Sequence, residues 1–550
     1  MIPRACLWVA TFMLVWLAGC QPSDEPLGQT LNSAGTPPAI EDGQSVLRRG
    51  NGTEPQTLDP HRSEGVPSSR ILRDLYEGLT TESPDGTIIP GAAQSWQISE
   101  DGLTYVFHMR PNGRWSNADP VTAHDFVYGL RRSVDPATAS AYALMLSPIA
   151  HADAIIAGDL PPTALGVEAI DPHTLIIHLQ HPTPYMLGML THSSAYPVHR
   201  ATIEKYGDQF SRPGKLVSNG AYLLSDWMVQ SHVMLDRNPY YWNDQATCID
   251  RIRYLAIENI VTELNRYRAG DLDWTSDVPN EQFEWLSKHL ASHLSIEPWL
   301  GSYYLGLNLT HPPFKDNLAL RQALSLAIDR QILTDKVTRS GQIPAYGWIP
   351  PVSDYTQYTP PEQDWSQEKR EARAIELYAL AGYDQERPLT AELRYNTQDN
   401  NKHIAIAVAS MWDQVLGVHT RLINEEWKVF LQNRRLMQVT EVFRAGWIGD
   451  YNDAYTFSSL WHSRHGLNDT GYNNPEYDAL LEQSQKAHDP EQRRNLLQKA
   501  EQILISDQPI IPIYFYVTKR LVNPRLTGWE PNIMDHHYSR SMCFTSSPSG

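Results

Sequence analysis

The sequence predicts an α/β protein with mixed sheets, divided into two or three lobes. Strand patterns and helical patterns follow one another along the chain without a strict βαβ rhythm, which favours mixed sheets over purely parallel ones. The chain has 550 residues, which is more than a single hydrophobic core usually serves. Only the N-terminal region contains a long apolar run, and it is considered first.

The N-terminus has the pattern of a secretion signal. Arg4 precedes an apolar run over residues 5–18 that is too short to span a bilayer and leads into Leu-Ala-Gly-Cys. These four residues resemble the lipobox of bacterial lipoproteins, so we expect a signal peptide over 1–19 and a lipid on Cys20. Gln21 follows instead of Asp, so the resemblance implies no inner-membrane retention signal. The alternative is a cleaved peptide with an incidental cysteine.

Residues 20–44 are rich in proline, serine and glycine. Such a composition buries too little apolar surface to form a core. We therefore expect a lipidated flexible tether there, with the folded body beginning at residue 45.

Periodicity predicts the elements of the body in order. Apolar residues recur at helical spacing from Ile71 to Leu79, behind the N-cap candidates Ser68 and Ser69. The same reasoning predicts strands over 103–109, 175–179, 221–224, 232–235 and 510–517, and helices that begin near Thr122 and cover 320–332, 367–381 and 489–506.

Composition and missing motifs exclude several classes of function. The net charge is −18, from 63 acidic and 45 basic residues, which disfavours nucleic acid as a partner. The chain lacks the nucleophile-elbow, phosphate-loop, His-Glu-x-x-His and complete dinucleotide-glycine signatures, so we expect neither an enzyme nor a cofactor. The pairs His462/His465 and His536/His537 have no cysteine or glutamate at metal-ligand spacing, and we expect surface histidines there rather than a metal site.

Two cysteines remain in the body, Cys248 and Cys543. An oxidising compartment permits a disulfide between them, but the sequence does not give the separation that a disulfide requires. Two separate buried thiols are the open alternative.

Residues 444–453 combine a carboxylate and a guanidinium with glycines and aromatic residues, after an alternating run over 436–443. Asp450 lies between two aromatic residues, so it is expected to be partly desolvated and to need a cationic partner. That partner is either Arg444, in an internal ion pair, or the ammonium group of a ligand. This segment alone favours the internal pair.

A resemblance to a known family runs through many segments in one order and covers nearly all of the chain after the signal. The segments are residues 54–60, 64–67, 115–127, 219–222, 345–347, 426–428, 444–452 and 514–521. They resemble the solute-binding proteins of oligopeptide ABC transporters, specifically the enteric type. The resemblance implies a three-lobed Venus-flytrap fold whose hinge, made of strands that cross between lobes I and III, closes around a ligand. Lobe I then covers 45–77, 202–300 and 518–550, lobe II covers 78–201, and lobe III covers 301–517.

By this resemblance, the site recognises the main chain and the two ends of a short peptide. Gly446 lies on a strand edge that pairs with the extended peptide, and Glu64 and Val66 lie on the facing segment of lobe I. Asp450 receives the ligand's ammonium, and Arg444 faces the carboxylate of short peptides. The other implied contacts are the pocket walls Trp427 and Trp447, the lobe II cover Tyr142, and the polar residues Asn468 and Asn401.

The chain departs from the enteric pattern at two places. Gly301 and Ile448 replace two cysteines that pair within lobe III, so that disulfide is absent. Neutral residues replace two basic residues that hold longer peptides, although each has a basic neighbour: Thr338 beside Arg339, and Asn401 beside Lys402. How the ends of tetra- and pentapeptides are held is therefore open.

The predicted function is that of a lipid-anchored periplasmic receptor, acting as a monomer, that delivers di- to pentapeptides to an inner-membrane ABC permease and its ATPase subunits. Two alternatives are a receptor specialised for murein tripeptide or another peptide conjugate, and a peptide-sensing lipoprotein. A periplasmic peptidase is disfavoured because nucleophile and metal motifs are missing.

Overall fold

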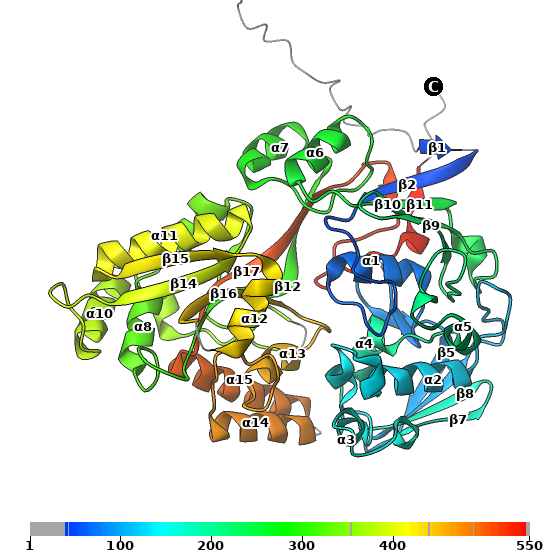
Figure 1. The fold of residues 1–550 in the computed structure, drawn as a ribbon, viewed down its shortest axis with the longest axis horizontal. Helices are drawn as coiled ribbons and strands as arrows, with labels where there is room; N and C mark the ends of the chain where they lie inside the picture. Colours follow the sequence, from blue (N-terminus) through cyan, green and yellow to red (C-terminus); the bar gives the residue numbers. More distant parts are fainter. Residues whose placement is uncertain (1–38, 42, 353–354, 438–439, 488, 546–550) are drawn as a thin grey trace, which may run out of the picture.

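The computed structural model describes residues 39–41, 43–352, 355–437, 440–487 and 489–545 (Figure 1). The predicted signal peptide, Cys20 and most of the predicted tether lie outside these residues. One strand, β1 (Ala39–Glu41), nevertheless falls inside the range predicted as tether, which corrects that boundary. It pairs with β2 (Gln44–Gly50) through a tight turn at Gly43, whose φ of 81° suits glycine.

Lobe I is built on a five-stranded sheet with the strand order β1-β2-β11-β10-β9. Strands β2 and β11 run parallel, and the other neighbours run antiparallel. The strands after β2 are β9 (Tyr222–Met228), β10 (His232–Arg237) and β11 (Arg251–Leu255), and the helices are α1 (Val66–Leu75), α5 (Arg200–Tyr206), α6 (Ile260–Arg268) and α7 (Phe283–His289).

Helix α1 begins earlier than the sequence predicts. Gly65 is its N-cap residue with a φ of 82°, and Pro67 lies in the first turn, where its fixed φ favours helix initiation. Ser68 and Ser69 are therefore inside the helix, and the prediction that they cap it is wrong. The helix ends at Leu75, so the last apolar residues of the predicted helix pack beyond its end.

Lobe II is built on a four-stranded antiparallel sheet with the order β5-β6-β8-β7. Helix α2 (Ala123–Val134) begins as predicted at Thr122, which forms a capping box with Asp125. The remaining elements are β3 (Thr80–Glu82), β4 (Ile88–Pro90), β5 (Ala93–Ile98), β6 (Thr104–Met109), β7 (Val167–Asp171), β8 (Thr174–His178), α3 (Ala152–Ile156) and α4 (Met186–Met189).

Lobe III is built on a six-stranded mixed sheet with the order β13-β17-β12-β16-β14-β15. Its strands are β12 (Leu294–Leu307), β13 (Ile343–Pro344), β14 (Thr390–Asn396), β15 (His419–Glu425), β16 (Val442–Ile448) and β17 (Ile510–Leu521). Its helices are α8 (Leu318–Leu326), α9 (Arg330–Ile332), α10 (Gln367–Leu380), α11 (Asp399–Leu416), α12 (Trp427–Leu436), α13 (Tyr455–Ser458), α14 (Pro475–Lys486) and α15 (Pro490–Asp507).

One helix prediction within lobe III needs correction. The stretch 320–332 is not one helix, because Asp329 starts a new one by accepting a hydrogen bond from the backbone N–H of Ile332 at 3.0 Å. The alternating run 436–443 is shared between two elements, since α12 ends at Leu436 and β16 begins at Val442. The predicted helices at 367–381 and 489–506 are confirmed by α10 and α15.

Strands β12 and β17 connect lobe I to lobe III (Figure 1). The start of β12, up to Pro298, pairs with the end of β17, and the register shifts before pairing resumes at Ser302. One hydrophobic core extends through lobes I and II and includes Leu47 and Phe107, whereas lobe III has two cores of its own. Lobes I and II therefore form one packed body, joined to lobe III by two long strands.

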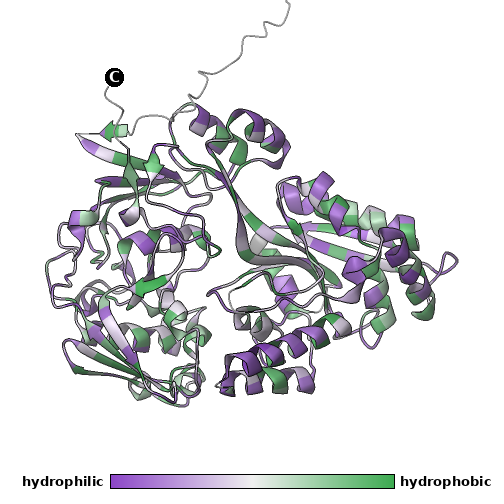
Figure 2. Ribbon diagram, turned by 180° about the vertical axis from the view of Figure 1, so that it is seen from behind, coloured by the Kyte–Doolittle hydropathy of each residue, from purple (hydrophilic) through white to green (hydrophobic). Residues whose placement is uncertain are grey.

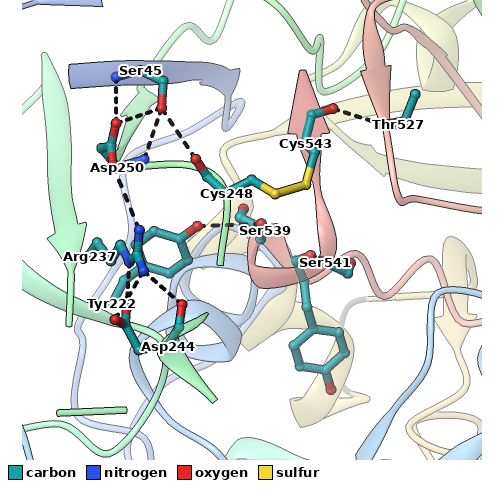
Figure 3. Close-up of a disulfide and its surroundings, with 11 residues drawn as sticks. Ser45, Tyr222, Arg237, Asp244, Cys248, Asp250, Thr527, Ser539, Ser541 and Cys543 are labelled. Atoms are coloured by element: carbon teal, nitrogen blue, oxygen red, sulfur yellow. Dashed lines mark hydrogen bonds and ion pairs between the residues drawn. A yellow bond between two sulfur atoms is a disulfide. The ribbon is translucent and has the colours of Figure 1, made fainter. Parts of the chain in front are cut away.

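The two body cysteines form a disulfide, which resolves the alternative left open by the sequence (Figure 3). Cys248 lies just before β11 and Cys543 lies in β19 (Cys543–Phe544), with their Cα atoms 5.2 Å apart. The carbonyl of Cys543 accepts a hydrogen bond from Thr527 in β18 (Leu526–Thr527) at 3.0 Å. The disulfide thereby ties the C-terminal β18–β19 pair to the main sheet of lobe I.

The peripheral helices contain both hydrophilic and hydrophobic residues along their length, as expected for helices with one buried face (Figure 2). Within the part of the chain that the structure describes, no helix is both long enough and apolar enough to cross a membrane.

The adjacent histidines His536 and His537 are not on the surface, which corrects the sequence prediction. The His536 ring bonds a carboxylate oxygen of Glu82 at 2.7 Å, and the His537 ring bonds Asp535 at 3.0 Å. Both rings are largely buried, and burial is the leading reason that the pKa of each lies below its usual range. These histidines therefore belong to a buried polar network that joins lobe I to Glu82 of lobe II.

Candidate peptide-binding cleft

The second half of β16 has an edge that no strand of the described chain covers. On one side, β16 pairs with β12 along its whole length. On the other side, β14 pairs only with Val442 and Phe443, so the edge from Arg444 to Ile448 lacks a strand partner. An uncovered edge presents backbone N–H and C=O groups that an extended chain can pair with. Gly446, the predicted edge residue, is exposed in this segment.

Packing explains why a glycine occupies position 446. A Cβ atom there would lie 2.5 Å from the hydroxyl of Tyr516, closer than such contacts allow. The same hydroxyl accepts a hydrogen bond from Arg444 at 3.2 Å. Tyr516 therefore fills the space beside the strand and links the glycine to the predicted carboxylate-binding residue.

Asp450 follows the end of β16 and supplies an unpartnered carboxylate. Its backbone N–H donates to the hydroxyl of Thr456 at 3.3 Å, which fixes the main chain. No residue of the described chain forms a hydrogen bond or ion pair with its carboxylate, and the side chain is only partly exposed. Burial raises the pKa of the Asp450 carboxyl to about 7. The site therefore contains a carboxyl group whose negative charge, when ionised, no described residue balances.

Residues of all three lobes meet near Asp450. Burial is the main reason that the pKa of the Tyr142 phenol is raised. The negative charges of Asp450 and of Glu64 in lobe I raise it further, so both carboxylates lie near this lobe II residue. Glu64 is exposed, and Val66 is the first residue of α1. Tertiary structure thus brings together Tyr142, Glu64 and Asp450. These residues were predicted to cover the ligand, to face it from lobe I and to receive its ammonium group.

Arg444 forms no ion pair with Asp450 or with any other carboxylate in the described residues, so the internal pair favoured by the isolated segment is wrong. Its guanidinium donates to the amide oxygen of Asn396 at 3.1 Å and to Tyr516 at 3.2 Å, and lies 4.9 Å from the centre of the Tyr303 ring. Its Nε atom is buried without a partner in this part of the chain. Neutral partners orient Arg444 and leave its charge uncompensated.

The other predicted contacts occupy different environments. Asn401 is buried and donates to Asn396 at 3.0 Å, which places it behind Arg444. Asn468 is also buried, and its amide donates to the carbonyl of Tyr472 at 2.8 Å within its own loop. Trp447 is half-buried, with an indole N–H that has no partner among the described residues. Trp427 begins α12, but its side chain lies outside the described part of the structure.

The sequence reasoning missed Tyr303, Tyr516 and Asn396, which hold the Arg444 guanidinium. The alternation of Tyr514 and Tyr516 along β17 places both on one face, and this was the available signal for an aromatic wall. Asn396 carries no such signal, because it reaches Arg444 only through the arrangement of β14 and β16.

A cavity of about 280 Å³ adjoins the predicted strand edge at Tyr516. Its lining includes Trp299, Ile343, Phe515 and Ile533, from strands of lobe III and the loop that follows β18. The indole N–H of Trp299 is buried there without a partner in the described chain. The cavity has the apolar character and scale suited to a side chain of a bound ligand.

The two positions that depart from the enteric pattern are complementary. Gly301 of β12 lies directly opposite Ile448 of β16. A Cβ atom on Gly301 would lie 2.5 Å from the Cδ1 atom of Ile448, so the isoleucine side chain fills the space above the glycine. Apolar packing therefore occupies the place where the family resemblance implied a disulfide.

Near Thr338 and Asn401, the positions expected to hold longer peptides, the neighbouring basic side chains of Arg339 and Lys402 are exposed rather than buried. Thr338 is buried and donates to Gln342 at 2.8 Å. Arg339 is exposed, with its Nε atom donating to the carbonyl of Lys336 at 2.6 Å, and Lys402 is exposed as well.

Comparisons with known proteins agree with this geometry. The model of the bacterial extracellular solute-binding proteins, family 5 (middle) matches residues 87–469. The chain is 44% identical over 527 residues to the periplasmic oligopeptide-binding protein OppA of Escherichia coli, covering 94% of each chain. The structure of the Escherichia coli murein tripeptide-binding protein MppA superposes with a TM-score of 0.85 at 38% identity, covering 92% of this chain and 100% of MppA.

A crystal structure of Haemophilus influenzae OppA in complex with the peptide RPPGFSPFR superposes with a TM-score of 0.83 at 41% identity, covering 92% of this chain and 100% of that one. These matches span lobes I, II and III and confirm the resemblance and the fold class inferred from the sequence. The chain belongs to the bacterial extracellular solute-binding proteins of family 5.

Proposed function

We propose that the protein is the periplasmic peptide receptor of an ABC importer. The observation that carries this proposal is the edge of β16 that no described strand covers. This edge begins at Arg444, whose guanidinium forms no ion pair within the described residues, and leads directly to Asp450, whose carboxylate has no partner there. An extended peptide has main-chain groups for the edge and one charge of each sign at its ends. Strong similarity to OppA and MppA supports the same function.

The geometry suggests how a peptide is held without selection for its side chains. Main-chain pairing to the Gly446 segment is available to almost any sequence. A charge-assisted bond from the ligand's ammonium to Asp450 contributes about 1.5–3 kcal/mol and sets the register, because it requires a free N-terminus. Arg444, oriented by neutral partners, faces the C-terminal carboxylate of a short ligand. The receptor then passes its ligand to a membrane permease energised by ATPase subunits.

Peptide length tests the proposal. We expect trialanine to bind at least as tightly as penta-alanine, because Arg444 is retained whereas the residues placed for longer ligands are neutral or turned outward. Isothermal titration calorimetry on trialanine, tetra-alanine and penta-alanine measures this, with chromatography of the samples to confirm that the peptides remain intact. A clear preference for the pentamer contradicts the length prediction. Failure of all three peptides to bind, or their cleavage, contradicts the receptor function.

A second candidate is a receptor specialised for murein tripeptide, favoured by the superposition on MppA over almost the whole chain. Competition calorimetry between murein tripeptide and trialanine separates the two functions. Binding of murein tripeptide at least a hundredfold tighter (about 2.7 kcal/mol) assigns the specialised role, and similar affinities assign the general one.

Membrane attachment through a lipid on Cys20 completes the proposal. We expect Cys20→Ser to release the protein from membranes, because a single thioether-linked anchor is removed while the folded body is unchanged. Fractionation of cells that express each form, followed by calorimetry of the released protein with trialanine, measures both properties. A Cys20→Ser protein that still sediments with membranes contradicts the anchor.

Peptide binding is expected to weaken as the pH falls below about 7. The pKa of the free Asp450 carboxyl is about 7, and a bound ammonium stabilises its ionised form. Below that pH the carboxyl must lose a proton on binding, so Kd rises by up to about tenfold for each pH unit. Calorimetry with trialanine between about pH 5 and about pH 6.5, where the peptide ammonium stays charged, measures the slope. Asp450→Asn is the control with a flat profile, and an equally flat wild-type profile contradicts the prediction.

A further inference from the structure

Tyr185 of lobe II packs into an aromatic cluster on lobe III. Its ring stacks on Tyr451 with a centroid separation of 4.7 Å and an interplanar angle of 3°, and on Tyr455 at 5.7 Å and 17°. The guanidinium of Arg493 lies 5.2 Å from the same ring. Tyr185 and Tyr451 are both 8% exposed, so the contact excludes solvent.

Each side of this contact is anchored in its own lobe. Tyr185 precedes α4, whose Met186 is fully buried in the core of lobes I and II. Arg493 of α15 is held in place by two hydrogen bonds to the carboxylate of Asp453, both at 2.8 Å. Arg493, one partner of the Tyr185 ring, is therefore held within lobe III by Asp453.

Tyr451 is the residue that joins the contact to the predicted binding site. It comes directly after Asp450, in a loop whose start is fixed by a hydrogen bond from the Gly449 N–H to the carbonyl of Leu300 at 2.8 Å. Although it belongs to lobe III by sequence, its side chain packs in the core of lobes I and II. At Gly188, three residues after Tyr185, a Cβ atom would make an ordinary van der Waals contact of 3.7 Å with the Cβ of Tyr451. Lobe II thus lies close to the residue that follows the carboxylate.

We propose that Tyr185 is a positioning residue for Asp450: stacking of Tyr185 on Tyr451 when the lobes close fixes the loop that presents the carboxylate to the ligand's ammonium. This inference rests on the proposed function. The Asp450 carboxylate has no partner among the residues that the structure describes, so its orientation depends on the main chain on either side. Separation of the lobes removes the stacking partner from one side of that loop. Peptide N-terminus recognition and lobe closure are therefore coupled through one aromatic contact.

The experiment compares Tyr185→Ala, Tyr185→Phe and the control Tyr128→Ala, which alters a half-buried tyrosine on α2 of lobe II. Kd is measured for trialanine and N-acetyl-trialanine, and Tm is measured without ligand. We expect Tyr185→Ala to weaken trialanine about five- to tenfold, as for loss of a buried aromatic pair, and to leave N-acetyl-trialanine nearly unchanged. Tyr185→Phe retains the ring and should bind like the wild type, as should Tyr128→Ala.

The ratio of the affinities for trialanine and N-acetyl-trialanine shows whether Tyr185 positions Asp450 or only helps to hold the lobes closed. Equal losses for both peptides in Tyr185→Ala make Tyr185 a closure contact only and overturn the proposal, as does an unchanged affinity for trialanine. If Tyr185→Ala lowers the Tm, the test depends on Tyr185→Phe. The proposal is also overturned if Tyr185→Phe does not restore the wild-type ratio of the affinities for trialanine and N-acetyl-trialanine. A wild-type protein that does not discriminate between the two peptides rejects the proposed recognition by Asp450, and this inference falls with it. If the ratio of the two affinities in Tyr185→Ala is as large as in the wild type, this inference alone is rejected.

Discussion

N-acetylation of a good peptide ligand is expected to weaken its binding to the wild-type protein by about 2–5 kcal/mol, the usual effect of truncating one partner of a buried charge pair. The Asp450 carboxylate has no partner in the described protein, and burial already raises its pKa to about 7. Acetylation removes the ammonium that would balance this charge. The affinity of trialanine and N-acetyl-trialanine, measured by calorimetry, gives the difference directly.

Asp450→Asn should weaken binding of the free peptide by a similar amount, because the amide cannot form the charge-assisted bond. The acetylated peptide should lose little further in that variant, since the interaction is already absent. Asp159→Asn, at an exposed carboxylate of lobe II, is the matched control and should bind both peptides like the wild type. Equal affinity of the wild type for free and acetylated peptide contradicts the assignment of Asp450 as ammonium receptor.

The stability of the ligand-free protein provides an independent check. An internal pair with Arg444 would make Asp450→Asn destabilising, because it would leave a buried guanidinium without its counter-charge. In the structure Arg444 is held instead by Asn396 and Tyr516. We therefore expect the Tm of ligand-free Asp450→Asn to equal or exceed that of the wild type, since a partly buried, unpaired charge is removed.

Removal of the Cys248–Cys543 disulfide is expected to destabilise the body formed by lobes I and II by about 2–5 kcal/mol. The bridge spans 295 residues of sequence, so it restricts a very large loop in the unfolded chain. Tm of Cys248→Ser/Cys543→Ser should fall by several degrees, and calorimetric scanning measures the shift. The affinity for trialanine should be unchanged, because neither cysteine contacts a residue of the candidate cleft.

Reduction of the wild-type protein supplies the matched test. Dithiothreitol should lower the Tm of the wild type toward that of the double variant and should leave the variant unaffected. An unchanged Tm of the fully reduced wild type, verified by thiol titration, contradicts a stabilising role for the disulfide.

Local patterns in the sequence determined most of the secondary structure. The helix that starts at Thr122 was predictable because a capping box involves residues only three positions apart. Strand β6 and helices α10 and α15 were predictable because their apolar periodicity is contained in one segment. The start of α1 and the break before Asp329 were missed, because several residues nearby could serve equally well as caps.

The family resemblance predicted binding roles for Asp450, Arg444 and Gly446, yet only the tertiary structure decided what surrounds them. Whether Arg444 pairs with Asp450 depends on Tyr516 and Asn396, which approach from other strands. The disulfide and the burial of His536 likewise depend on residues hundreds of positions away. Sequence alone therefore predicted the compartment signal, and it determined the local elements and the kinds of charge available. The pairing of those charges was decided by long-range packing, because the energy of a buried ion depends on which groups the fold brings within a few ångströms of it.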